Sequence, residues 1–112
     1  MTVTIYHNPR CGKSRDTLNL ILSKGIAPKI VEYLKTPPSA AELKQILGWL
    51  GMSAKDILRS KEAAENGIDP NLPDDRLIAA MIAHPIAIER PIVVADGRAR
   101  LGRPPEKVLE IL

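Results

Sequence analysis

A single cysteine lies in a short polar segment near the N-terminus. Within four positions of Cys11 the chain carries three cations and no carboxylate: Arg10, Lys13 and Arg15. The thiolate is the nucleophilic form of cysteine, and nearby cations or a helix N-terminus lower the pKa of a thiol below about 8.5. Proline, asparagine and glycine neighbours do not suit a buried, inert cysteine. We therefore predict that Cys11 is a reactive nucleophile.

Two further neighbours are expected to tune this thiol. His7, in its charged form, would favour the thiolate, and the Ser14 hydroxyl would donate a hydrogen bond to the sulfur. Backbone amides and cations at the start of a helix would also hold an oxyanion beside the sulfur. The candidate residues of this loop and helix start are Asn8, Arg10, Gly12, Lys13 and Arg15.

Ser14 also stands where a Cys-x-x-Cys redox pair would carry its second cysteine. Without a second thiol, a dithiol mechanism within this chain is excluded. A disulfide formed by Cys11 must then be resolved by an external thiol, such as glutathione or glutaredoxin.

The composition is that of one globular domain. The chain has 112 residues, of which 45% are hydrophobic and 26% charged. No apolar run approaches the roughly 20 residues that a membrane-spanning helix needs, and the N-terminus lacks the pattern of a signal peptide. A single cysteine excludes an internal disulfide framework and is typical of the reducing cytosol. We therefore expect a cytoplasmic protein that does not bind membranes.

The charge distribution favours a small anionic ligand. The net charge is +3, and the excess of cations lies near the two ends of the chain, in residues 1–15 and 90–107. Aromatic residues make up only 3% of the chain, so the stacking platforms of many nucleic-acid-binding proteins are not expected. Two histidines and one cysteine, far apart, predict no metal site. We also expect no bound cofactor.

The N-terminal part of the chain predicts a strand–helix–strand crossover. Residues 3–6 and 29–34 are rich in β-branched and apolar residues and predict two strands. Apolar residues at helical spacing predict a helix between them, from about Gly12 to Gly25. Cys11 would then follow the first strand and lie at the start of the first helix.

The rest of the chain predicts a helical segment and a hairpin. Several helices are expected over residues 39–83, and Ser39 and Glu42 form a capping box at their start. Residues 62–73 are expected to form a loop between them. Asp96-Gly97, between two alternating runs, predicts a type I′ hairpin, and a final helix follows.

This order of elements predicts a single α/β domain over residues 1–112. Its mixed sheet would have about four strands, with a helical insertion at about residues 39–83. The same order is found in the thioredoxin and glutaredoxin fold, in which a reactive cysteine follows the first strand.

Several segments resemble the glutaredoxin-linked arsenate reductase family, in its short, single-cysteine branch. They are residues 7–15 around Cys11, Tyr33-Leu34 followed by Pro37-Pro38, Leu58-Arg59, Arg90-Pro91-Ile92-Val93-Val94 and Gly102-Arg103-Pro104-Pro105-Glu106. The similarity covers nearly the whole chain in the same order. The resemblance implies reduction of arsenate, or of a similar oxyanion, with glutathione as co-substrate and glutaredoxin as partner.

The resemblance also implies roles for individual residues. Cys11 matches the nucleophile, and His7 and Ser14 match positions that tune the thiol. Three arginines match the residues that hold the oxyanion: Arg59, Arg90 and Arg103. Pro91 is expected to follow a cis peptide bond beside the cysteine, a conformation found in only about 5–6% of X-Pro bonds.

Two alternative functions stay open from the sequence. One is a single-cysteine thiol reductase for another oxyanion or for glutathionylated proteins. The other is an Spx-like redox-sensing regulator that binds RNA polymerase, although such regulators commonly keep Cys-x-x-Cys.

Overall fold

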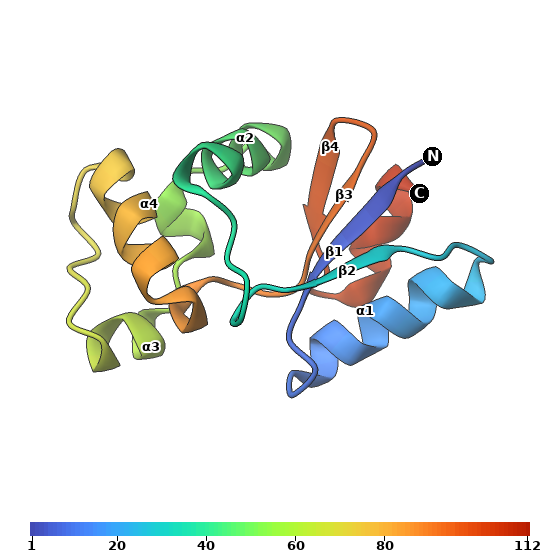
Figure 1. Ribbon diagram of the computed structural model, residues 1–112, viewed down its shortest axis with the longest axis horizontal. Coiled ribbons are helices and arrows are strands. Elements are labelled where there is room, and N and C mark those ends of the chain that lie inside the picture. The colour runs from blue at the N-terminus through green and yellow to red at the C-terminus, as the bar shows by residue number, and fades with distance from the viewer. The chain divides into compact units, whose positions relative to one another are not determined.

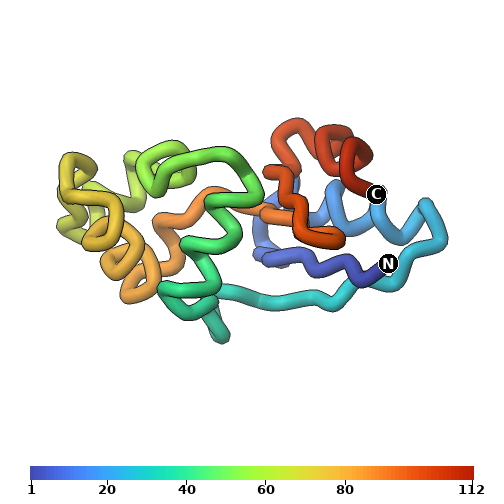
Figure 2. The backbone as a smooth tube through the Cα atoms, turned by 90° about the horizontal axis from the view of Figure 1, so that it is seen from above, coloured from blue at the N-terminus to red at the C-terminus, as the bar shows by residue number.

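The computed structural model describes all 112 residues, and the chain divides into two compact units. The sheet unit comprises Met1–Thr36 and Arg90–Leu112, and the helical unit comprises Pro37–Glu89. The helical unit thus extends slightly beyond the insertion that we predicted at about residues 39–83. The two positively charged ends of the chain both belong to the sheet unit. Figure 2 shows the C-terminal part of the chain returning beside the N-terminal strand.

The sheet unit contains a four-stranded mixed sheet with the strand order β2-β1-β3-β4 (Figure 1). β1 (Val3–His7) is parallel to β2 (Lys29–Glu32), and α1 (Gly12–Ser23) connects the two. On its other side β1 is antiparallel to β3 (Ile92–Ala95), which is followed by β4 (Arg98–Leu101). This topology confirms the predicted thioredoxin-like architecture.

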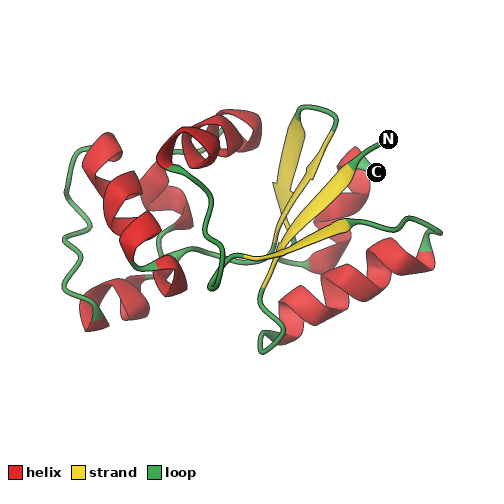
Figure 3. Cartoon of the chain, viewed as in Figure 1, coloured by secondary structure: helices red, strands yellow, loops and turns green.

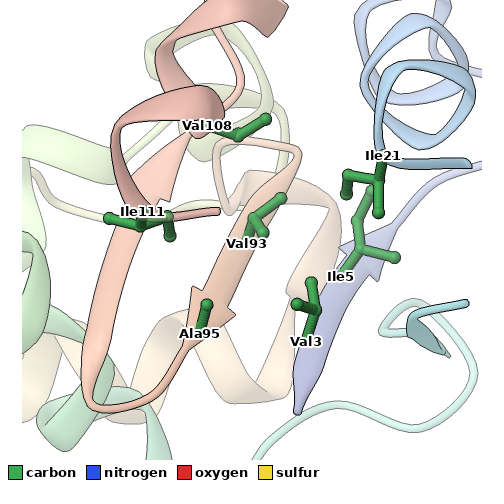
Figure 4. Packing of buried hydrophobic residues seen from close by; sticks show 7 residues of the cluster. All are labelled: Val3, Ile5, Ile21, Val93, Ala95, Val108 and Ile111. Atoms are coloured by element: carbon green, nitrogen blue, oxygen red, sulfur yellow. The ribbon is translucent and has the colours of Figure 1, made fainter. Parts of the chain in front are cut away.

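Apolar side chains of the sheet, of α1 and of the C-terminal 3-10 helix η3 (Pro105–Ile111) form the core of this unit. Alternate residues of β1 face the core, so Val3 and Ile5 are buried. Figure 4 shows the packed side chains of Val3, Ile5, Ile21, Val93, Ala95, Val108 and Ile111. Each isoleucine or valine buried in this way contributes roughly 1.5–3 kcal/mol. The core therefore holds α1, and the loop that precedes it, firmly against the sheet.

The turn between β3 and β4 has the predicted type I′ geometry. Asp96 and Gly97 have φ angles of 49° and 76°, and a type I′ turn requires positive φ at both central positions. The register pairs Ile92, at the start of β3, with Leu101, at the end of β4. The residues just before β3 and just after β4 therefore emerge at the same edge of the sheet.

The helical unit contains helices and loops only (Figure 3). Its elements are α2 (Ala40–Leu50), η1 (Ala54–Ile57), α3 (Ser60–Glu65), α4 (Asp74–Ala83) and η2 (Pro85–Ala87). The predicted capping box is present, since the Ser39 hydroxyl accepts a hydrogen bond from the Glu42 backbone at 3.1 Å. None of the helices in the chain has the length and apolar character needed to cross a membrane.

Two boundaries differ from the sequence prediction. The loop predicted over residues 62–73 is wrong in its first part, because α3 continues to Glu65. Ala63 is the one buried residue of this short helix, so its sequence carries no periodic signal. β2 ends at Glu32 rather than at Leu34, because the backbone turns back and donates two hydrogen bonds to the Glu32 carbonyl.

A close approach of α1 to the end of β4 requires glycine at position 102. Gly102 donates its N–H to the Pro91 carbonyl at 3.0 Å. A Cβ at this position would lie 2.7 Å from Pro91 Cγ and would overlap the Thr17 hydroxyl.

We predict that Gly102→Ala lowers the free energy of unfolding by about 1–3 kcal/mol, the usual cost of overpacking. Chemical denaturation measures this change. Gly48→Ala is the control, because Gly48 lies within α2 with open space around its Cβ position. The control should gain up to about 1 kcal/mol from helix propensity. Equal stabilities of Gly102→Ala and the parent chain would contradict the close packing.

Candidate active site

Cys11 is the N-cap residue of α1, in the loop that connects β1 to this helix. The loop is held by its own backbone, since the Cys11 N–H donates to the Asn8 carbonyl at 3.0 Å. The buried Asn8 side chain accepts the Arg10 N–H at 3.0 Å. The Cys11 side chain is half-buried. The sulfur is thus fixed at the positive end of a helix and remains accessible to a small reactant.

Two arginines from the ends of the β3–β4 hairpin reach the same sulfur. Arg103 Nη1 lies 4.0 Å from Cys11 Sγ and also donates to the Arg90 carbonyl at 3.2 Å. The Arg90 side chain donates a hydrogen bond to Cys11. The Arg90–Pro91 peptide bond is cis, as expected, and the Arg103–Pro104 bond is also cis, which the sequence analysis did not anticipate.

The pKa of Cys11 reflects opposing influences. Burial is the largest and raises the pKa of the thiol, because it disfavours the charged form. The Ser14 backbone N–H, the hydrogen bond and charge of Arg90, and the Lys13 backbone N–H act in the opposite direction. Together they outweigh burial, so the pKa of Cys11 lies below its ordinary value. These groups therefore favour the thiolate of Cys11 more than the surroundings of an ordinary cysteine do.

His7 and Ser14 form a buried pair beneath this loop. His7 Nδ1 and Ser14 Oγ share a hydrogen bond of 2.6 Å, and Ser14 Oγ also accepts the Asn8 N–H at 3.0 Å. Burial lowers the pKa of His7, Glu32 opposes this, and Arg15 adds to it, with a net shift downward. A neutral His7 does not supply the positive charge that we expected. The Ser14 hydroxyl bonds to His7 and Asn8 instead of the sulfur, and its backbone N–H acts on Cys11.

The remaining candidates of the loop are exposed. Arg10, Gly12, Lys13 and Arg15 all lie on the surface. The Arg15 guanidinium donates to the Pro9 carbonyl at 3.0 Å, so it braces the loop from outside. No hydrogen bond or ion pair engages the Arg10 guanidinium, which is free to bind a ligand.

Arg59 lies in the helical unit, whereas Cys11, Arg90 and Arg103 gather in the sheet unit. Its guanidinium forms ion pairs with Glu62 and with Glu89, the latter at 2.7 Å. Burial lowers the pKa of Arg59, but the hydrogen bonds and charges of Glu62 and Glu89 raise it by more. The net shift is upward, so Arg59 stays positively charged. The role of Arg59 in holding an oxyanion stays a prediction.

A pocket that the sequence did not predict lies beside the cysteine loop. This pocket has a volume of about 410 Å³ and is lined by His7, Asn8, Pro9, Arg10, Glu32, Leu34 and Lys35. The parallel register places His7 opposite Glu32. The C-terminal ends of parallel strands share one edge, where ligands commonly bind. The sequence contained a signal for this pocket, because residues 3–6 and 29–34 predict two neighbouring parallel strands whose C-terminal ends lie at one edge.

The comparisons with known proteins extend over the same residues. The sequence model of the ArsC family matches residues 6–111, which include the cysteine loop and all three arginines. The chain belongs to the ArsC family. This membership confirms the resemblance to arsenate reductases that the motifs indicated.

Relatives of this ArsC family chain align over its whole length. The uncharacterized protein YfgD of Escherichia coli is 54% identical over 98% of this chain and 96% of its own length. The arsenate reductase of Rhizobium meliloti is 52% identical over 100% of this chain and 82% of its own length. The arsenate reductase from Vibrio cholerae has a solved structure with a TM-score of 0.93 at 52% identity, over 100% of this chain and 98% of that one. The similarity to this solved structure supports the thioredoxin-like fold described above.

Arg90→Ala in this ArsC protein should raise the pKa of Cys11, because both a hydrogen bond and a nearby positive charge are lost. The pH dependence of Cys11 alkylation measures this shift. Arg100→Ala is the matched control, since Arg100 lies on β4 and pairs with Glu110 at 2.7 Å. It should leave the pKa of Cys11 unchanged. A folded Arg90→Ala protein with an unshifted thiol would refute the electrostatic role of Arg90.

Ser14→Ala should lower the free energy of unfolding by about 1–3 kcal/mol, because the His7 ring and the Asn8 N–H lose a buried partner. The pKa of Cys11 should change much less than in Arg90→Ala, since the backbone N–H at position 14 remains. Chemical denaturation and thiol alkylation measure the two effects separately. A rise in thiol pKa as large as that of Arg90→Ala would show that the hydroxyl itself stabilises the thiolate.

Proposed function

We propose that this protein is an arsenate reductase that uses Cys11 as its nucleophile and takes electrons from glutathione and glutaredoxin. The observation that carries the proposal is the half-buried Cys11 sulfur at the start of α1, with Arg90 and Arg103 beside it. Membership of the ArsC family, and relatives about half identical that bear the name arsenate reductase, support it.

The charges around the sulfur suit an oxyanion. Arsenate is an anion near neutral pH, and the thiolate adds a further negative charge. The planar guanidinium group of the exposed Arg103 can donate parallel hydrogen bonds to arsenate oxygens. The more buried guanidinium of Arg90 adds positive charge beside the sulfur. The positive end of the α1 dipole adds a further attraction for the anion. The family resemblance adds Arg59 as a third guanidinium, and that assignment belongs to this proposal.

The first chemical step joins the Cys11 sulfur to arsenic. A sulfur–arsenic bond forms while an arsenic–oxygen bond breaks, and the oxygen leaves as water after taking up protons from the arsenate and the solvent. A lowered thiol pKa speeds this step because it raises the fraction of nucleophilic thiolate.

The second step reduces the arsenic. The thiol of glutathione attacks the Cys11 sulfur and the sulfur–arsenic bond breaks, with its electron pair remaining on arsenic. As(V) thereby becomes As(III) and leaves as arsenite, while the two sulfurs are oxidised to a mixed disulfide. Thiol–disulfide exchange with glutaredoxin and a second glutathione then restores Cys11. The sum is one arsenate and two glutathione thiols giving arsenite, water and glutathione disulfide.

Selectivity between arsenate and phosphate would come from the second step. The two anions have similar shape and charge, so binding alone discriminates between them poorly. Thiols reduce As(V) but do not reduce phosphate, and only arsenate would therefore be turned over.

Cys11→Ser should abolish arsenate reduction, because the chain has no other thiol. The assay combines the purified protein with arsenate, glutathione, glutaredoxin and glutathione reductase, and follows the consumption of NADPH. Omitting glutaredoxin should slow turnover, which tests the proposed reductant. Arg100→Ala, which changes a surface ion pair on β4, should retain activity.

Arsenate turnover by a folded Cys11→Ser protein would rule out the proposed nucleophile. A panel of other oxyanions and a glutathionylated peptide in the same assay tests the alternative thiol reductases. Turnover of one of these, with none of arsenate, would replace the arsenate proposal.

A further inference from the structure

The pocket beside the cysteine loop lies on the opposite side of β1 from the two arginines. Arg90 and Arg103 flank the β3–β4 hairpin, and β3 is one neighbour of β1. Glu32 is the last residue of β2, and Lys35 follows this strand. β2 is the other neighbour of β1 (Figure 1). The loop that carries Cys11 begins where β1 ends. The oxyanion-binding cations and the pocket therefore approach this loop from two different sides.

The geometry points to this pocket as the binding site for glutathione. The inference rests on the proposed function, because it assigns a place to the thiol that attacks Cys11. A thiol that displaces a leaving group from sulfur approaches in line with the bond that breaks, from the side opposite the leaving group. With arsenic held on the side of Arg90 and Arg103, this opposite side is the β2 side, where the pocket lies against Asn8, Pro9 and Arg10 of the cysteine loop.

The size and charges of the pocket fit this tripeptide. Its volume of about 410 Å³ falls within the roughly 300–1,000 Å³ typical of small-molecule sites. Two cations and one carboxylate line it, namely Arg10, Lys35 and Glu32. Glutathione carries two carboxylates and one ammonium group, which is the complementary set. The exposed apolar side chain of Leu34 offers a surface to the peptide backbone.

These charged groups are available for a ligand. No hydrogen bond or ion pair engages the Arg10 guanidinium, which immediately precedes the cysteine in sequence. Lys35 forms an ion pair with Glu32 at 3.6 Å, with 77% of the lysine side chain exposed. Exposed ion pairs of this kind contribute little, so both partners can turn to the carboxylate and ammonium groups of glutathione. Arg10 would anchor the carboxylate nearer to the reacting sulfur.

The test measures the binding of S-methylglutathione, which cannot react, to the intact protein by isothermal titration calorimetry. Lys35→Glu and Arg10→Glu should each weaken this binding about tenfold, the loss expected when one charge-assisted hydrogen bond is removed. The KM for glutathione should rise by a similar factor. Lys24→Glu is the matched control, since the exposed Lys24 caps the far end of α1. It should leave both values unchanged.

The binding measurement stands apart from catalysis. S-methylglutathione that binds, and whose affinity falls in Lys35→Glu and Arg10→Glu but not in Lys24→Glu, supports the site even if arsenate proves not to be reduced. Absence of binding, or equal affinities in all three variants and the parent chain, overturns it. Arsenate turnover that persists in that case would leave the proposed function standing and place the glutathione elsewhere.

Discussion

The ionisation of one sulfur atom governs this site. Burial opposes the thiolate at Cys11, and the helix amides and Arg90 favour it. The same partial burial that makes the anion costly also excludes water, so each nearby positive charge acts more strongly than it would in solution. A fully exposed cysteine would feel these groups weakly, and a fully buried one would be closed to reactants. The half-buried position at the start of α1 lies between these extremes.

The β3–β4 hairpin carries the two arginines beside the sulfur, and the apolar core fixes the position of the Cys11 sulfur. Arg90 and Arg103 are distant from Cys11 in sequence, but the tight turn at Asp96-Gly97 returns β4 beside β3 and brings both arginines to one edge of the sheet. The packing of α1 and η3 against that sheet fixes the helix whose N-terminus carries the sulfur. Arg90 is partly buried and Arg103 is exposed, and both keep their alignment on the sulfur because the core fixes the strands that carry them.

The buried His7–Ser14 pair has a structural role distinct from that of the arginines. The downward shift of the His7 pKa keeps the ring neutral at neutral pH, so the pair holds the loop by hydrogen bonds rather than by charge. The groups that lower the pKa of the Cys11 thiol are Arg90 and the backbone N–H groups of Ser14 and Lys13, not His7. Under the proposed mechanism, this chain with one cysteine takes its second thiol from outside. If the oxyanion and that thiol bind on different sides of the loop, both can reach the Cys11 sulfur.

The sequence by itself determined the features that depend on neighbouring residues. The capping box at Ser39 and Glu42, the turn at Asp96-Gly97 and the crossover around α1 all follow from local sterics and hydrogen bonds, and the motif around Cys11 indicated the family. The six residues of α3 gave no such signal, because a short helix is stabilised by the contacts it makes rather than by its own periodicity.

Tertiary structure decided the contacts between residues distant in sequence. It placed Arg103 beside Cys11, gave the Ser14 hydroxyl to His7 and Asn8, and set Glu32 and Lys35 beside the cysteine loop. Hydrogen-bond partners and charge balance depend on distances of a few ångströms. Those distances exist only after the apolar core has fixed the sheet, the helix and the hairpin relative to one another.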